Sequence, residues 1–442
     1  METTDGPGET TVSTAGATTT QSTNSTTGPT TSAPETTDAP GTTDAPGTTD
    51  ALDTTNTITS TGPGSDTTTG SESGSSGEPG ESSTGGPSVC GPPCAQTWTH
   101  LGDLVIYPGA PTAEYECMDL VAGTLQIFGN FDAAALAPLR NLRFTSGLRI
   151  EYNDALTDLS PFECLEEATN NLALYQMPAL VDASALGKLR AASNIQIEQT
   201  ALTGLPAFAP DFTGVENVFI RSNPALVEIS AMASWGPIPS DYLAIQLDDN
   251  PVLKSLVGID GPLAAAADVA GANVGVQVTK APQLASLAGL EPMTHGSLWL
   301  QGLPKVPDLL PLASLTQGNN ITLFGLPVVK NLQGLHNLVT TDWLMIGDCI
   351  NEKPGSPGMD GLVDLSGLDS LTTANSLSIA NNANLTALTG APVLSKVSGM
   401  EVIENPKLTP AKVDEFVMTL DGMPDACVGG FDQCTCFELL PW

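Results

Sequence analysis

The sequence predicts a mainly β fold, a right-handed, leucine-rich β-solenoid of about twelve coils that follows a disordered tail and ends in a capping helix. Three observations support this prediction. An apolar-x-apolar triplet recurs with a base period of 23 residues, which is the signature of stacked units that share one core. The first 87 residues are dominated by Thr, Ser, Gly and Pro, and an amphipathic pattern follows the last triplet.

Residues 1–87 are expected to form a disordered, acidic stalk. Besides Val12, their only large aliphatic residues are Leu52 and Ile58. Such a segment cannot bury enough apolar surface to offset the entropy of ordering its backbone, roughly 1–2 kcal/mol per residue. The sequence Thr-Thr-Asp-Ala-Pro-Gly at 36–41 recurs at 42–47. The composition favours an extended spacer, and it also permits an O-glycosylated, mucin-like stalk.

The charge of the chain argues against one class of partner. The formal net charge is −35, and no Lys or Arg precedes Arg140. Binding to nucleic acids and to anionic lipid surfaces is driven by Lys and Arg, so we expect no nucleic-acid partner.

No run of apolar residues approaches the roughly 18 that a membrane span requires. The start of the chain also shows no signal-peptide pattern.

Eight cysteines indicate an oxidising compartment. Six of them cluster at the two ends of the repeat region, which predicts disulfide-stapled end caps. The ends lack the paired Cys and His spacings of a zinc site. The disulfide candidates are Cys90, Cys94, Cys117, Cys427, Cys434 and Cys436.

Some of the pairings can be narrowed from the repeat. Cys117 is expected to pair with Cys90 or Cys94, and the last three cysteines with one another or with Cys349. Cys164 and Cys349 lie about eight coils apart, on the order of 38 Å, which is too far for a disulfide.

Because the cysteines indicate an oxidising compartment, we expect an extracytoplasmic protein, secreted or displayed at the cell surface. A lipid anchor upstream of Met1 is one form that the display could take.

Twelve apolar-x-apolar triplets define the repeat region, and each predicts a short strand in a parallel stack with about 4.8 Å between neighbours. The steps between successive triplets are 23, 24, 23, 23, 27, 31, 22, 23, 23, 33 and 23 residues, so three turns are longer than the rest. The apolar members are Leu125 and Ile127, Leu148 and Ile150, Leu172 and Leu174, Ile195 and Ile197, Val218 and Ile220, Ile245 and Leu247, Val276 and Val278, Leu298 and Leu300, Ile321 and Leu323, Leu344 and Ile346, Leu377 and Ile379, and Met400 and Val402.

Each coil is expected to turn at a fixed corner after its strand. Asn tolerates turn conformations and bonds its own backbone, while Pro fixes the exit from the strand. Leucines then recur at steps of three, as in Leu253, Leu256 and Ile259, which suits extended corners with inward side chains worth roughly 1.5–3 kcal/mol of burial each. The corner asparagines, three residues after the second apolar position, are Asn153, Asn223, Asn250, Asn382 and Asn405.

This pattern, strand-x-x-Asn-Pro-x-Leu-x-x-Leu-x-Gly-Leu, resembles the receptor L-domain repeat, found in receptor ectodomains and in many bacterial surface proteins. The best-matching stretches are 244–259 and 275–290, and the resemblance covers roughly residues 117–421. The alternative is an ordinary leucine-rich repeat, where an apolar residue follows the Asn after two positions. The step here is three, as from Asn250 to Leu253. The resemblance implies a domain that binds an extracellular polypeptide.

The chain is expected to have four parts. Residues 1–87 form the stalk, 88–124 a Cys-containing N-terminal cap, 125–408 the solenoid, and 409–442 a C-terminal cap with a helix and a Cys cluster. Thr409 can cap this helix and Pro410 suits its first turn. Such a helix would shield the open edge of the last coil. Its apolar side comprises Val413, Phe416, Val417 and Leu420.

We expect no enzyme, no cofactor and no metal site. His100, His295 and His336 are not at metal-ligand spacing, and no hydrolase triad, phosphate-binding loop or dinucleotide motif is present. Residues 248–250, Asp-Asp-Asn, offer oxygen ligands that would suit Ca²⁺. They occupy a corner where Asn recurs for turn formation, so we interpret them as a turn.

The middle residue of each triplet should face away from the core, and most of these residues are polar. Phe219, Trp299 and Met345 are exceptions, and Phe324 should point the same way two positions beyond Thr322. Exposed aromatic residues and Met commonly anchor partners, so these four are the candidate binding residues. The alternative is that the long turns fold over this face and bury them, namely 231–242, 259–274 and 350–361.

Together these features predict a non-catalytic surface or secreted binding module. It would be receptor-like or adhesive, and it would recognise an extracellular protein or glycan through its sheet face and loops. The alternative is a structural cell-envelope protein without a discrete ligand, in which the stalk is a spacer.

Overall fold

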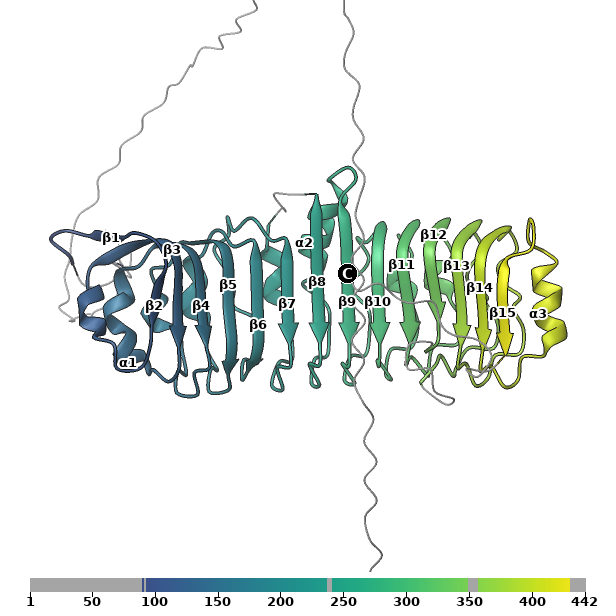
Figure 1. The fold of residues 1–442 in the computed structure, drawn as a ribbon, viewed down its shortest axis with the longest axis horizontal. Coiled ribbons are helices and arrows are strands. Elements are labelled where there is room, and N and C mark those ends of the chain that lie inside the picture. The colour runs from purple at the N-terminus through teal and green to yellow at the C-terminus, as the bar shows by residue number, and fades with distance from the viewer. Residues whose placement is uncertain (1–89, 91–92, 237–240, 349–356, 430–442) are drawn as a thin grey trace, which may run out of the picture. The chain divides into compact units, whose positions relative to one another are not determined.

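A computed structural model of the chain describes residues 90, 93–236, 241–348 and 357–429 (Figure 1). The chain divides into two compact units, residues 1–82 and 83–442, and every described residue belongs to the second. The predicted stalk lies outside the described residues, as do Cys349, Cys434 and Cys436.

The described residues form one parallel sheet of 15 strands, stacked in chain order from β1 through β3 to β15, with β2 paired to β3 (Figure 1). The strands are β1 Trp98–His100, β2 Leu104–Ile106, β3 Met118–Phe128, β4 Phe144–Glu151, β5 Glu167–Met177, β6 Asn194–Thr200, β7 Asn217–Arg221, β8 Tyr242–Asp248, β9 Asn273–Thr279, β10 His295–Gln301, β11 Gln317–Phe324, β12 Thr340–Ile346, β13 Thr373–Ala380, β14 Lys396–Ile403 and β15 Asp425–Gly429.

Few helices interrupt the strands. The α-helices are α1 Ala133–Leu136, α2 Asp260–Ala267 and α3 Pro410–Val417. The 3-10 helices are η1 Thr112–Tyr115, η2 Ala137–Asn141, η3 Ser160–Phe162, η4 Ser184–Lys188, η5 Ser230–Ser234, η6 Leu310–Leu312 and η7 Gln333–Leu335.

The predicted triplets fall, one each, in β3 to β14, and the register keeps them in line. Leu148 pairs with Leu172, and Ile150 with Leu174. The inward members of the triplets are buried in one continuous core. A mainly β, leucine-rich-repeat-like stack of parallel strands is therefore confirmed. Strands β1, β2 and β15 extend the sheet beyond the triplets that the sequence revealed.

The corner after each strand depends on two adjacent residues. The residue before the Asn is the one in the left-handed conformation, with φ 58° at Tyr152, 53° at Ser222 and 54° at Asp249. The Asn itself is buried and bonds the backbone, as Asn250 Nδ2 does to the carbonyl of residue 248 at 3.2 Å. The sequence predicted that the Asn itself would take the turn conformation. That prediction is wrong, because the preceding residue has the positive φ, but the predicted hydrogen bond from the Asn side chain to the backbone is present.

Corner asparagines of adjacent coils also bond one another. Asn223 Nδ2 donates to Asn250 Oδ1 at 3.2 Å, and Asn382 Nδ2 donates to Asn405 Oδ1 at 3.1 Å. These two short Asn ladders are separated by coils whose corner slot holds a buried apolar residue. The apolar corner residues are Ala281, Leu303 and Leu326. In the coil of β12, which carries a long turn, the buried Met359 takes this place, because its backbone N–H donates to Asn382 Oδ1 at 2.9 Å as that of Asn223 does to Asn250 Oδ1.

The later corners hold the leucines that recur at steps of three. Leu253, Leu256 and Ile259 are buried. Several of these corners are 3-10 helices, η3 to η7, rather than the extended segments we expected. At Gly258 φ is +121°, and a Cβ there would lie 2.3 Å from the carbonyl oxygen of Ile229. Only glycine lets adjacent coils approach this closely.

Helix α3 follows the last predicted strand, as the amphipathic pattern indicated, and lies beyond β15 at the end of the stack (Figure 1). Val413 and Phe416 are buried on one side of it, and Leu420, three residues beyond its end, is buried as well. Thr409 occupies the N-cap position with Pro410 at N1, but its side chain makes no capping hydrogen bond. The chain then returns to the sheet as β15, which pairs with β14.

The described cysteines include two that are disulfide-bonded near the N-terminal end of the stack. Cys94 is joined to Cys117, one of the two pairings expected for Cys117. Cys427 is also disulfide-bonded. Cys90 and Cys164 are thiols.

Candidate functional site: the outer face of the sheet

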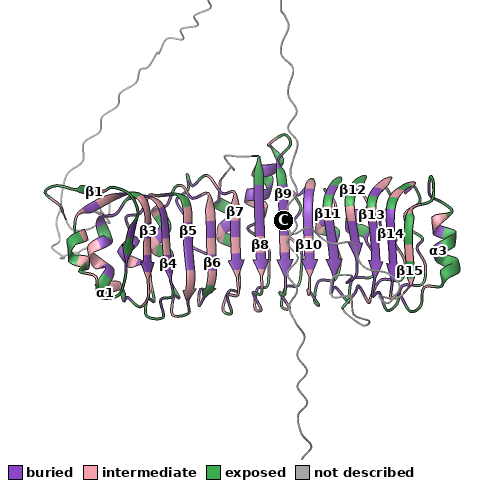
Figure 2. Ribbon diagram, in the orientation of Figure 1, coloured by how far each residue is buried: buried purple, intermediate pink, exposed green. Residues whose placement is uncertain are grey.

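The outer face of the sheet, the face opposite the core, divides into two regions. From β3 to β10 the middle residues of the triplets are half-buried, apart from the buried Ala173. From β11 to β14 the corresponding residues are buried, namely Thr322, Met345, Ser378 and Glu401. Figure 2 shows this difference: the lower halves of β11 to β14 are purple, whereas pink residues lie along β3 to β7.

Two predicted binding residues lie in the buried region. Phe324 is only 2% exposed and Met345 only 1%. Met345, Ala380 and Ile403 form a second small core on the outer face, against which Trp343 and Cys427 pack. Phe324 and Met345 are therefore buried, which is the alternative that the sequence left open for them. The small core around Met345 contributes to the burial of that residue.

One of the long turns returns against the buried region. The backbone N–H of Gly325, directly after β11, donates to the carbonyl oxygens of Pro357 and Gly358 at 3.1 and 3.0 Å. Most of the turn itself, residues 349–356, lies outside the described residues. The described part of this turn therefore lies beside the end of β11.

The other two long turns pack on the core side. Trp235, from the turn at 231–242, is 1% exposed and stacks with Phe208 at 5.1 Å between ring centroids, inside the main core. The Ala run of 259–274 forms α2, which packs beside η5. Neither accounts for the half-burial of Phe219 or Trp299.

Phe219 and Trp299 lie half-buried in the open region of the outer face. The guanidinium of Arg221 lies over the ring of Phe219, 4.7 Å from its centroid. Trp299 Nε1 donates to Gln301 Oε1 at 3.1 Å, and its ring meets Phe324 edge-on at 6.2 Å. Trp299 therefore marks the boundary between the open and the buried regions.

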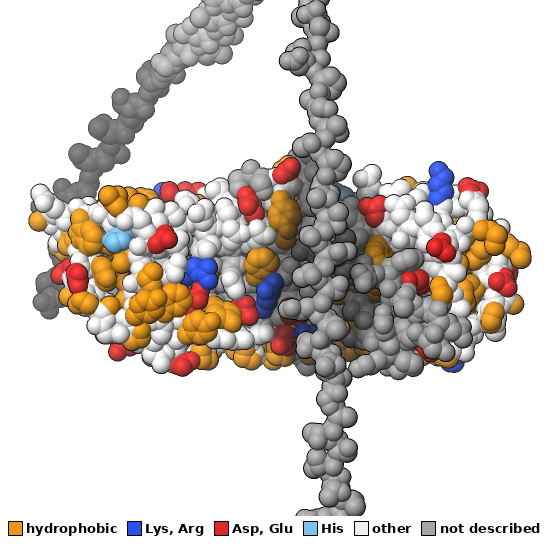
Figure 3. All heavy atoms as spheres, in the orientation of Figure 1, with side chains coloured by type: hydrophobic (Ala, Val, Ile, Leu, Met, Phe, Trp, Pro, Cys, Tyr) orange, Lys and Arg blue, Asp and Glu red, His pale blue; other side chains and the backbone are white. Residues whose placement is uncertain are grey.

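Four further aromatic residues at the ends of β2 to β5 were not predicted. Tyr107 is 59% exposed and stacks on Phe128 with ring centroids 5.7 Å apart. Tyr152 is 52% exposed and meets Tyr175 edge-on at 5.4 Å. Figure 3 shows hydrophobic side chains gathered over the lower ends of β2 to β5. We call Tyr107, Phe128, Tyr152 and Tyr175 the aromatic row.

Part of the aromatic row left a signal in the sequence. Phe128 and Tyr175 each lie two positions beyond the middle residue of a triplet, as Phe324 does, so strand alternation would have placed them on the outer face. Tyr152 is the left-handed residue of its corner. Tyr107 precedes Pro108 after the short strand β2, whose Leu104-Val105-Ile106 also fits the triplet pattern but was not among the twelve aligned triplets.

Several charged side chains near the open region contact an oppositely charged or polar neighbour. Arg149 contacts Glu151, and Lys280 Nζ lies 3.5 Å from Asp248 Oδ1. Gln196 Nε2 donates to Glu198 Oε2 at 3.1 Å. Although the whole chain is strongly acidic, these pairs leave aromatic rings and amide groups as the main contact groups of this region.

The histidines make no catalytic arrangement in the part of the chain that the structure describes. His100 Nε2 contacts the carbonyl oxygen of Asp103 at 3.3 Å, and His295 Nε2 that of Ala272 at 2.7 Å. His336 Nδ1 likewise contacts a backbone carbonyl. Among the described residues, no group of three or more His, Cys, Asp or Glu could hold a metal ion. None of the described helices is long and apolar enough to cross a membrane.

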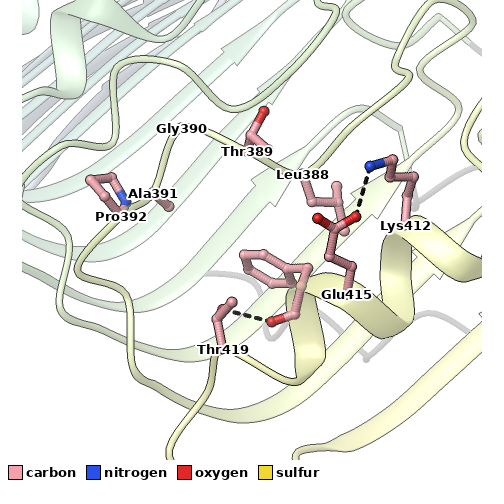
Figure 4. Close-up of a pocket in the computed structure, with 9 residues that line it drawn as sticks. Leu388, Thr389, Gly390, Ala391, Pro392, Lys412, Glu415 and Thr419 are labelled. Atoms are coloured by element: carbon pink, nitrogen blue, oxygen red, sulfur yellow. Dashed lines mark hydrogen bonds and ion pairs between the residues drawn. The ribbon is translucent and has the colours of Figure 1, made fainter.

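Two hollows lie away from the outer face of β3 to β10. One, of about 290 Å³, lies between the turn at 388–392 and α3, where Lys412 and Glu415 form an ion pair at 2.7 Å (Figure 4). The other, of about 520 Å³, follows the corners and is lined mainly by proline and glycine, including Pro282, Pro304 and Pro327. Neither brings reactive side chains together.

Comparisons with known proteins do not place the chain in a family. No protein-family model and no curated protein matches the chain. Among solved structures, the crystal structure of a TLR13–ssRNA13 complex is similar over 71% of this chain and 57% of that chain, with 13% sequence identity and a TM-score of 0.25. The chain thus spans a little over half of the length of that protein. At this TM-score the likeness carries no argument about a ligand.

Proposed function

We propose that this chain is a non-catalytic binding module of the receptor L-domain kind, located outside the cytoplasm, which recognises a protein partner through the outer face of β3 to β10. The observation that best supports this is the aromatic row, four rings gathered on one open sheet face. Phe219 and Trp299 continue this aromatic surface toward the centre of the stack.

The chemistry of these residues suits a protein partner. Tyr, Trp and Phe are enriched at protein interfaces, and Tyr and Trp supply many of their energetic hot spots. In the pairs Tyr107–Phe128 and Tyr152–Tyr175 each ring packs against a second ring, so little side-chain entropy remains to be lost when a partner binds.

The size of the open region also fits a macromolecule. Eight strands at about 4.8 Å spacing span roughly 34 Å, and seven residues of strand span about 20 Å. The resulting area of roughly 700 Å² is close to the 800 Å² that one partner contributes to a standard protein interface. The paired charges favour a partner with an apolar rather than a strongly charged contact surface.

The proposal is tested by cross-linking the purified full chain to cell-surface proteins of its source and quantifying captured proteins by mass spectrometry. The test variant is Tyr152→Ala/Tyr175→Ala. The matched control is Val363→Ala/Val393→Ala, which removes two equally exposed apolar side chains from corner turns. Hot-spot residues contribute about 2 kcal/mol or more each, so loss of two should weaken the affinity for a true partner by roughly a thousandfold.

Each outcome decides the matter. A protein that the parent and the control capture equally, and that the aromatic variant loses, supports the proposal. Equal capture by all three variants refutes it. A glycan array with the same variants covers the glycan alternative, since aromatic-dependent binding to an oligosaccharide would replace the protein partner. Concentration-dependent light scattering by the chain alone, with no captured partner, would favour a structural envelope protein.

A further inference from the structure

Four side chains occupy the same corner on successive coils at the N-terminal end of the stack. Cys117, Asn141, Cys164 and Lys188 are separated by 141 − 117 = 24, 164 − 141 = 23 and 188 − 164 = 24 residues, which is the repeat period. Asn141 and Lys188 end η2 and η4, and Cys164 follows η3. Parallel stacking at one period places such positions directly beside one another.

Two cysteines that precede the sheet lie against this row of four. Cys94 is bonded to Cys117 and accepts a hydrogen bond from Asn141 Nδ2 at 3.2 Å. Four residues earlier in the chain, Cys90 Sγ accepts a hydrogen bond from Lys188 Nζ at 2.7 Å. The Cys164 thiol lies near enough to Cys90 to interact with it electrostatically, and the Lys188 ammonium interacts with both sulfurs. Cys94 thus contacts the first two positions of the row, and Cys90 the next two.

We propose that Cys90 and Cys164 form a second disulfide in the mature protein, beside Cys94–Cys117, so that the N-terminal segment is stapled twice along this corner. Cys90 is held at this corner by its hydrogen bond from Lys188, and Cys164 occupies the same corner position one repeat before Lys188. The neighbouring bond has a Cα–Cα distance of 5.7 Å, within the usual range for disulfides. This inference is independent of the proposed ligand.

The reaction is thiol–disulfide exchange with a small-molecule or protein disulfide as the oxidant. Cys90 attacks one sulfur of the oxidant, which forms a mixed disulfide and releases the first thiol. Cys164 then attacks the Cys90 sulfur, which forms the Cys90–Cys164 bond and releases the second thiol. The two cysteine protons and two electrons end on the reduced oxidant, so atoms and charge balance.

The order of the two attacks follows from exposure. Cys90 is half-buried, whereas Cys164 is fully buried. Burial, with a further contribution from the interaction with Cys90, raises the pKa of Cys164 to about 12. Because the thiolate is the attacking species and an external oxidant cannot reach a buried sulfur, Cys90 reacts first and Cys164 resolves the mixed disulfide.

The test uses the full chain, equilibrated in a buffer of reduced and oxidised glutathione, alkylated with iodoacetamide in denaturing urea so that buried thiols also react, digested and mapped by mass spectrometry. We expect a peptide pair joined through Cys90 and Cys164 that separates on reduction. In Cys164→Ala, glutathione should be trapped on Cys90, whereas in Cys90→Ala none should appear on Cys164. Alkylation of both thiols in a protein that retains Cys94–Cys117 overturns the proposal.

Unfolding in urea gives a second measurement on the same variants. Under oxidising conditions Cys90→Ala, Cys164→Ala and the double variant should lower the urea midpoint by the same amount, because each removes one shared bond. After reduction of all disulfides, the difference in urea midpoint between Cys90→Ala and the parent chain should largely disappear. Additive losses from the two single variants under oxidising conditions would mean that the two residues are not bonded.

Discussion

Two corner asparagines are equally buried but make different numbers of hydrogen bonds, so replacing each should change the stability of the protein by a different amount. Asn223 and Asn153 are both fully buried. The side chain of Asn223 makes five hydrogen-bond contacts: Oδ1 accepts two from Thr200, and the two hydrogens of Nδ2 are shared among three oxygens of neighbouring residues. The side chain of Asn153 accepts two backbone hydrogen bonds, and its Nδ2 has no partner.

The expected difference in the free energy of unfolding between the two variants follows from these hydrogen bonds. Each hydrogen bond contributes about 0.5–1.5 kcal/mol net, and an orphaned buried donor costs about 1–3 kcal/mol. We expect Asn223→Ala to destabilise the protein by about 2–4 kcal/mol more than Asn153→Ala, because three further bonds are lost. Both substitutions remove the same atoms, so the comparison cancels the loss of packing.

The assay is urea unfolding followed by tryptophan fluorescence, since the buried Trp235 lies in the coil that follows Asn223. Amide hydrogen exchange gives the local readout, because the Thr200 N–H donates to Asn223 Oδ1 at 3.0 Å and should lose protection in Asn223→Ala. Equal stability losses in the two variants, or unchanged protection of Thr200, would refute the assignment of the extra stability to the ladder.

Two further predictions concern a glycine and a carboxyl group. Gly334→Ala should cost more stability than Gly271→Ala in urea unfolding, since a Cβ at Gly334 would lie 1.6 Å from the Leu309 oxygen. Gly271 has φ +78° with nothing within 4 Å, so its substitution costs only the left-handed strain, about 1–2 kcal/mol. Hydrogen bonds from Ser160 lower the pKa of Asp158. The ionised carboxylate of Asp158 therefore stabilises the folded protein above the ordinary Asp pKa, and this stabilisation is lost as the pH falls through the lowered pKa. Asp158→Asn should remove this acid-side dependence, by less than about 1 kcal/mol at this half-exposed site, and an unchanged pH profile would contradict it.

The stacked core could be predicted because its signal is periodic. Every triplet combines two inward apolar residues with a fixed step to the next, so position in the repeat fixes position in the core. The same arithmetic would have aligned Cys117, Cys164 and Lys188, which are one or more periods apart. That alignment was missed because the cysteines were grouped by their distance from the chain ends rather than by their position in the repeat.

The outer face was harder to predict because its burial is not periodic. Met345 and Trp299 occupy the same position in their coils, yet one is covered and the other is not. The difference lies in neighbours such as Ala380 and Ile403, which form a second small core on β12 to β14 alone. The sequence pattern of a single coil does not predict which side chains of other coils cover its outer face.

The gap between the two Asn ladders bears on how such a protein changes length in evolution. From Ala281 to Met359 the corner slots hold apolar side chains, which form no hydrogen bond that a neighbouring coil must match. A coil gained or lost inside a ladder would leave a buried amide without its partner, whereas one gained or lost between β9 and β12 would leave only apolar contacts to be remade. Repeat duplication and deletion should therefore be tolerated best in the middle of the stack, so that relatives of different length would keep both ends unchanged.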